Sequence, residues 1–174
     1  MEVPIATEFI QYSIIPMSIK KVKPTSKSGF KQGYYKPHNP EKYMGPGPII
    51  YRSSWERKFF HWCDHNQDVI KWVSEPFSIK YFNILDKKFH NYYPDAYIKM
   101  KKGELFEEYV VEIKPKAQLQ KPKPPKRKTA KAMKNFQYGY ETYVRNLCKT
   151  EALNKVAIQR NFKVMLLTED SKLF

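Results

Sequence analysis

The stretch that decides the fold runs from residue 92 to residue 114 and reads YYPDAYIKMKKGELFEEYVVEIK. Aromatic and β-branched residues, which favour strands, are frequent near both of its ends, at residues 92–98 and 106–114. Two lysines and a glycine at 101–103 form a turn sequence between them. The stretch therefore predicts an antiparallel β-hairpin, because a short glycine-containing turn between two strand-like segments is typical of that motif.

Two carboxylates and a lysine occupy defined positions of this hairpin. Side chains alternate between the two faces of a strand, so Glu112 and Lys114 project together, and strand pairing can bring Asp95 beside Glu112. Two neighbouring carboxylates are costly unless a cation or a proton lies between them. Mg²⁺ suits such a site, with Mn²⁺ as a substitute, and Lys114 could orient or help to deprotonate an attacking water. A hairpin with purely structural charges is the alternative at this point.

The residues upstream of the hairpin predict a helix and two extended segments. Ser53 precedes Glu56 by three residues, which is the spacing of a capping box, and apolar residues then recur at helical spacing until Asn66. The extended segments lie at 69–73 and 77–82. A proline between them excludes one continuous central strand.

The residues downstream complete a mixed α/β pattern. Apolar side chains at helical spacing predict two helices, at 135–149 and 150–160, and residues 162–168 form a final apolar strand. The order of helix, three or more strands, helices and strand predicts an α/β or α+β domain with a mixed sheet. We divide the chain into an N-terminal extension and basic arm at 1–47 and a domain at 48–174.

Length and composition suit one domain of ordinary size. The chain has 174 residues, of which 41% are hydrophobic, so it can bury a real core. Two cysteines exclude a disulfide scaffold. The first residues lack a basic start followed by an unbroken apolar run, so we predict neither a signal peptide nor a membrane span and expect a reducing, intracellular folding environment.

The net charge of +15 is concentrated in two segments that prolines interrupt. Residues 20–42 carry +6 and residues 115–134 carry +8. Proline does not fit helix interiors or central strands, so we predict a basic arm and a basic proline- and lysine-rich loop. Such segments suit a polyanion, because each neutralised phosphate releases counterions; a linker or a docking site for a protein partner is the alternative. The candidate DNA-binding residues are Lys121, Lys123, Lys126, Arg127 and Lys128.

Other notable side chains receive structural interpretations. The cluster at residues 61–65 contains two histidines, a cysteine and an aspartate but no CxxC pair, so a buried structural cysteine is favoured over a zinc site. Glu75 is expected to be a carboxylate at the end of a strand rather than a ligand. The aromatic residues of the arm are expected to anchor it on the domain rather than to stack on bases; they are Phe30, Tyr34, Tyr35 and Tyr43.

Pro94-Asp95 and Glu112-Ile113-Lys114 resemble the motif of the PD-(D/E)xK nuclease superfamily. More of the chain, at 51–56, 73–81 and 161–169, resembles the head-completion nucleases of T-even-type tailed phages and the N-terminal catalytic domain of the endonuclease subunit of heteromeric transposases. The resemblance implies a restriction-endonuclease-like αβββαβ core. It also implies that Asp95 and Glu112 are metal ligands, that Lys114 is the catalytic lysine and that Glu56 is an added acidic residue of the metal site. The alternative for Glu56 is a structural role alone, in which it closes the helix end opposite Ser53.

These observations lead to two functional hypotheses. The first is a Mg²⁺-dependent DNA endonuclease or end-trimming nuclease that acts on double-stranded DNA in phage head completion or DNA packaging. It would work in the host cytoplasm, with portal, neck or capsid proteins as further partners, no membrane, and retention in the virion as an open alternative. The second is a virion head or neck protein that keeps the nuclease fold and binds packaged DNA or the portal without cutting. The complete set of Asp95, Glu112 and Lys114 favours the enzyme.

Overall fold

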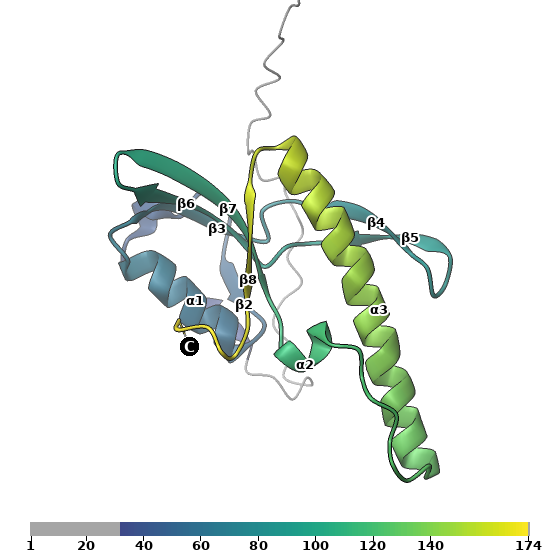
Figure 1. The fold of residues 1–174 in the computed structure, drawn as a ribbon. Coiled ribbons are helices and arrows are strands. Elements are labelled where there is room, and N and C mark those ends of the chain that lie inside the picture. Colours follow the sequence, from purple (N-terminus) through teal and green to yellow (C-terminus); the bar gives the residue numbers. More distant parts are fainter. Residues whose placement is uncertain (1–31, 174) are drawn as a thin grey trace, which may run out of the picture.

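The computed structural model describes residues 32–173 and contains a four-stranded mixed sheet. Its strands are β3 (Val69–Ser74), β6 (Ala96–Lys102), β7 (Leu105–Ile113) and β8 (Lys163–Leu167), in the order β3-β6-β7-β8 (Figure 1). The first three are antiparallel neighbours, and β8 runs parallel to β7. The hairpin predicted from residues 92–114 is therefore the β6–β7 centre of the sheet, and Gly103 lies in its turn with a φ of 61°.

Helices cover both faces of this sheet. Helix α1 (Ser54–His65) packs on the face that carries Trp72, Ile98 and Val111, whereas the C-terminal half of α3 (Ala130–Gln159) packs near Val110 on the other face. Together, α1, the four strands and α3 form the αβββαβ core of a restriction-endonuclease-like fold, as predicted. No helix within residues 32–173 has both the length and the apolar character needed to span a membrane.

A second hairpin is inserted between β3 and β6. It consists of β4 (Ile79–Asn83) and β5 (Lys88–Tyr92), which pair with each other as a separate two-stranded sheet and pack against α3. The prediction of one continuous extended segment at 92–98 was wrong, because Tyr92 ends β5 and β6 begins at Ala96. Pro94 lies in the break and cannot donate a ladder hydrogen bond.

Helix α3 also differs from its prediction. One helix of 30 residues replaces the two predicted at 135–149 and 150–160, since neither proline nor glycine interrupts their junction. It begins earlier than predicted, where the Thr129 hydroxyl accepts a hydrogen bond from the Ala132 N–H and caps the helix. The predicted basic loop at 115–134 therefore contains the short helix α2 (Lys116–Leu119) and the first turn of α3.

The described part of the N-terminal arm packs on the domain. Strand β1 (Gly33–Tyr35) pairs with β2 (Ile49–Tyr51), and the 3-10 helix η1 (Pro40–Lys42) follows β1. The Tyr43 ring lies edge-on to Trp72, with ring centres 4.7 Å apart, and Tyr35 contacts the same ring. Anchoring by these two tyrosines is as predicted, whereas Tyr34 is exposed; Phe30 lies outside the described residues.

Candidate active site

The β6–β7 register brings the two halves of the predicted motif together. Ala96 pairs with Val111, so Asp95 stands opposite Glu112 at the next position of the ladder. The backbone N–H of Ile113 donates a 2.6 Å hydrogen bond to Oδ2 of Asp95. Backbone pairing between β6 and β7 thus places the two carboxylates side by side.

Lys114 joins both carboxylates. Its ammonium lies 2.7 Å from Oε1 of Glu112 and 3.7 Å from Oδ2 of Asp95. The backbone N–H of Lys114 donates to the Leu167 carbonyl, which extends the pairing with β8 beyond Ile113. The predicted trio of Asp95, Glu112 and Lys114 is therefore contiguous in space, at the C-terminal end of β7.

Glu56 reaches this cluster from the first turn of α1. The Ser53 hydroxyl accepts a bond from the Glu56 N–H, as the capping spacing predicted. The Glu56 carboxylate accepts bonds from the Arg52 N–H, at 2.8 Å, and from the Ser53 hydroxyl, at 2.9 Å. Its charge also acts on Asp95 and Lys114, so the helix cap and the acidic cluster share this carboxylate.

The electrostatics of the cluster favour an added positive charge. Burial and the neighbouring Glu112 carboxylate raise the pKa of Asp95 to about 8. Burial also raises the pKa of Glu56. Although burial alone would lower it, the carboxylates of Asp95, Glu112 and Glu56 raise the pKa of Lys114. Three carboxyl groups around one ammonium cannot all ionise at neutral pH without a further positive charge, and their oxygen atoms fit a hard divalent cation such as Mg²⁺.

Tyr92 is a member of the cluster that sequence reasoning missed. Its hydroxyl donates a hydrogen bond to Oε2 of Glu112, the oxygen that does not contact Lys114. Twenty residues separate Tyr92 from Glu112, and the contact arises because the end of β5 lies over β7. The only sequence signal was its position just before the Pro94-Asp95 motif.

Glu75 lies beside the cluster in a different pairing. Its carboxylate forms an ion pair of 3.1 Å with Arg52, and its backbone N–H donates to the Asp95 carbonyl. Glu75 adopts a φ of 49°, which is uncommon for a residue with a side chain. As predicted, it is a carboxylate at the end of a strand, and its strained turn helps to hold Asp95.

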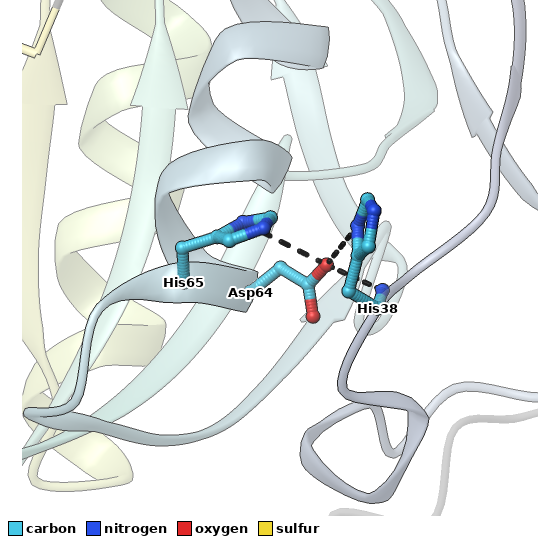
Figure 2. Close-up of side chains that lie close together, drawn as sticks. All are labelled: His38, Asp64 and His65. Carbon is cyan, nitrogen blue, oxygen red and sulfur yellow. Dashed lines mark hydrogen bonds and ion pairs between the residues drawn. The ribbon is translucent and has the colours of Figure 1, made fainter.

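A separate cluster of His38, Asp64 and His65 offers three metal-ligand atoms within 4.8 Å of one another (Figure 2). Oδ2 of Asp64 lies 3.6 Å and 3.9 Å from the Nδ1 atoms of the two histidines. This buried carboxylate already accepts hydrogen bonds from the Tyr35 hydroxyl and from two backbone N–H groups, those of His38 and Asn39. Cys63 is fully buried beside it, as the structural interpretation predicted. The carboxylate is thus explained by its role in fixing the segment after β1.

The fold is that of a restriction-endonuclease-like nuclease, and comparison with known proteins identifies the family. Residues 66–169 match the family described as TnsA-like endonuclease N terminal. The chain is also 39% identical, over 139 residues, to the head completion nuclease of Enterobacteria phage T4, a match that covers 79% of this chain and 91% of that protein. The chain belongs to the TnsA-like endonuclease family.

These similarities confirm the two resemblances predicted from the sequence, and the chain is a nuclease by family. Asp95, Glu112 and Lys114 all lie within the residues that match the family, whereas Glu56 lies upstream of them. The three-residue motif thus belongs to the shared domain.

Proposed function

We propose that the chain is a Mg²⁺-dependent endodeoxyribonuclease that hydrolyses phosphodiester bonds of double-stranded DNA at the Asp95–Glu112–Lys114 cluster. The observation that carries the proposal is the proximity of these three side chains at the end of β7. The Lys114 ammonium lies 2.7 Å from a carboxylate oxygen of Glu112 and 3.7 Å from one of Asp95. Two adjacent carboxylates and a lysine combine the groups needed to bind a divalent cation and to offset charge on a phosphate.

Asp95 and Glu112 would hold the ion directly, with Mn²⁺ as a substitute for Mg²⁺. A bound Mg²⁺ would polarise a phosphate oxygen and favour formation of hydroxide from water. Among residues 32–173, one possible ligand atom from each of His38, Asp64 and His65 lies within 4.8 Å of the other two. The carboxylate oxygens of Glu56, Asp95 and Glu112 do not all come that close together. Glu56 would therefore act through a water ligand, which suits an ion that usually keeps several waters.

The protein side chains then have distinct tasks. Lys114 carries its proton in this arrangement because the carboxylates raise its pKa, so it would orient water and neutralise charge at the scissile phosphate. Tyr92 would hold Glu112 in position through its hydroxyl. Partners outside the ligand set commonly tune a metal site by orienting its ligands.

The family relationship supports a role in phage head completion. The T4 relative is named for that process, and we assign the same role to this chain, acting on DNA ends or on packaged DNA in the host cytoplasm. The basic insert would contact phosphates on either side of the cut. Its five candidate DNA-binding residues are all exposed: Lys121, Lys123, Lys126, Arg127 and Lys128.

A cleavage assay tests this proposal. The purified chain should cut or nick duplex DNA with Mg²⁺ or Mn²⁺, and EDTA should stop the reaction. Asp95→Ala and Lys114→Ala should each abolish cleavage and leave DNA binding in place. Asp86→Ala and Lys155→Ala are matched controls, because both side chains are exposed and lie outside the cluster.

Cleavage that persists in both cluster variants would overturn the site assignment. DNA binding without cleavage under every metal condition would favour the second hypothesis, a DNA-binding head or neck protein with a nuclease fold.

A further inference from the structure

Two cations lie one turn apart on α3, on the side that faces the inserted hairpin. Arg145 and Lys149 are both half-buried and are separated by four residues, so their side chains are neighbours on the helix surface. The charge of Arg145 acts on both Tyr81 and Lys149. Like charges at this spacing destabilise a helix, so α3 gains nothing from the pair itself.

Lys149 lies against the candidate active site. Its ammonium is 5.3 Å from the centre of the Tyr92 ring and 5.8 Å from that of Tyr81. Tyr92 in turn donates its hydroxyl to Glu112. Burial and the positive charge of Lys114 lower the pKa of Lys149, whereas Glu112 and Asp95 act in the opposite direction. The two lysines therefore approach the same acidic cluster from different elements.

Neither cation has a carboxylate partner among residues 32–173. No Asp or Glu oxygen of this part of the chain lies within 4.0 Å of Arg145 or Lys149, whereas Lys155 on the same helix pairs with Glu151 at 2.7 Å. A partly desolvated cation is costly without an anion beside it, and aromatic rings offset only part of that cost. No carboxylate of residues 32–173 neutralises this pair of cations, so the pair is suited to an anion that comes from a ligand.

We propose that Arg145 and Lys149 form a phosphate-binding site for the DNA strand that enters the active site, so that they hold a phosphodiester next to the one that is cut. This proposal rests on the proposed nuclease function and adds a binding site for the substrate strand to it. The guanidinium fork suits two oxygens of one phosphate, and the lysine adds a point charge. The site also gives α3 a direct role in placing the substrate over Glu112.

The two cations could instead serve only to pack α3 on the hairpin, and the two roles predict different losses. A packing role predicts that Lys149→Gln lowers thermal stability and leaves DNA affinity unchanged. A phosphate-binding role predicts a lower affinity and a smaller dependence of binding on salt. Lys149→Arg keeps the charge and should restore most of the affinity, which a packing role does not require.

The experiment measures binding of a short DNA duplex to the full chain in EDTA, where cleavage is stopped, across a series of salt concentrations. The variants are Arg145→Gln, Lys149→Gln, the double substitution and Lys149→Arg, with Lys155→Gln as the control that removes one charge from the same helix. Each phosphate that is no longer neutralised should reduce the slope of log affinity against log salt by about 0.9. It should also lower the affinity by about eightfold at 0.1 M salt. The control should leave both unchanged.

The outcomes separate this site from the function on which it rests. An unaltered slope in the double variant, with normal cleavage by the unsubstituted chain, would overturn the phosphate site alone. Absence of duplex binding and of cleavage by the unsubstituted chain would overturn both. If the double variant unfolds, the single variants decide the question. A normal salt slope for Arg145→Gln, together with no recovery of affinity in Lys149→Arg, also rejects the site.

Discussion

The backbone N–H of Ile113 donates a hydrogen bond of 2.6 Å to Oδ2 of Asp95 and so ties the two halves of the motif to each other. Glu112 and Lys114 flank this donor and turn their side chains to the same carboxylate cluster. The strand thus supplies one backbone donor and two side chains within three residues. Asp95 is held by sheet geometry, which also forces it close to Glu112, and the stability of the chain should reflect that enforced proximity.

The first prediction concerns Asp95 and pH. Burial and Glu112 raise the pKa of Asp95 to about 8, so between pH 4 and pH 8 the folded chain binds a proton that the unfolded chain has released. Stability from this group is therefore fully present below about pH 4 and is lost as the pH rises towards about 8. Asp95→Asn should flatten this part of the profile and raise the melting temperature of the metal-free chain at pH 8 by several degrees.

Thermal melts in EDTA from pH 5 to pH 8 check this prediction, with Asp86→Asn as the control in an exposed carboxylate. Added Mg²⁺ should stabilise the unsubstituted chain and have less effect on Asp95→Asn. A lower melting temperature for Asp95→Asn at pH 8 would contradict the prediction.

The second prediction concerns Asp64, whose contribution to stability depends on pH in the opposite direction from that of Asp95. Burial alone would raise its pKa, but hydrogen bonds from the His38 and Asn39 backbone and from Tyr35 lower it. Its contribution to stability is therefore present above about pH 4 and is lost as the pH falls below that value. Asp64→Asn should destabilise the chain by about 2 kcal/mol at pH 7, because charge-assisted hydrogen bonds are weakened.

Denaturant unfolding of the Asp64 variant at pH 7 and pH 3.5 measures this difference, which should shrink at the lower pH. Addition of Zn²⁺ gives a second readout. Stabilisation of the unsubstituted chain by Zn²⁺, absent in both Asp64→Asn and His38→Ala, would instead make the cluster in Figure 2 a metal site.

The third prediction separates the two tasks of Glu56. Glu56→Gln removes the charge but keeps an amide oxygen that can accept from the Arg52 N–H, and the Ser53 cap on the Glu56 N–H is untouched. Stability should therefore change by less than about 1 kcal/mol. Cleavage should fall about 10- to 100-fold if Glu56 supports the ion through water. A normal cleavage rate, with Glu151→Gln as the control, would leave Glu56 with the cap alone.

The fourth prediction concerns Tyr92. Tyr92→Phe removes the hydroxyl that donates to Glu112 and keeps the ring against Tyr81. The fold should persist at a cost of about 1–3 kcal/mol, because the substitution leaves a buried Glu112 oxygen without its donor. Cleavage should fall about tenfold, because Glu112 loses the partner that orients it. Tyr109→Phe is a close control, since Tyr109 also donates to a glutamate, Glu107, but outside the motif. Equal rates for the two variants would argue against a positioning role.

The fifth prediction concerns the basic insert. Replacing its five candidate DNA-binding residues by Ser should weaken duplex binding without sequence preference and flatten the salt slope by roughly 0.9 for each phosphate that the insert no longer neutralises. The fold should persist, because these side chains are exposed; the replaced residues are Lys121, Lys123, Lys126, Arg127 and Lys128. An unaltered slope combined with failure to assemble into particles would assign the insert to a protein partner such as a portal or neck subunit.

Local signals in the sequence were sufficient for much of the fold and for the centre of the site. Gly103 and its lysines mark the β6–β7 turn, and Ser53 with Glu56 marks the start of α1, because turns and helix caps depend on residues a few positions apart. Alternation along β7 placed Glu112 with Lys114 for the same reason. The position of Asp95 opposite Glu112 followed from pairing two strands joined by one short turn.

Tertiary structure decided whatever depends on chain segments far apart. Only the fold places the Tyr92 hydroxyl on Glu112 and Lys149 beside the same ring, because β5 and α3 reach the site through packing that no local pattern encodes. It also made α3 a single helix, since its C-terminal half buries Leu153 and Ala157 against the sheet and the inserted hairpin. Residue spacing therefore determined the acidic pair and its lysine, whereas packing across the sheet decided that Tyr92 contacts Glu112 and that Lys149 lies beside the Tyr92 ring.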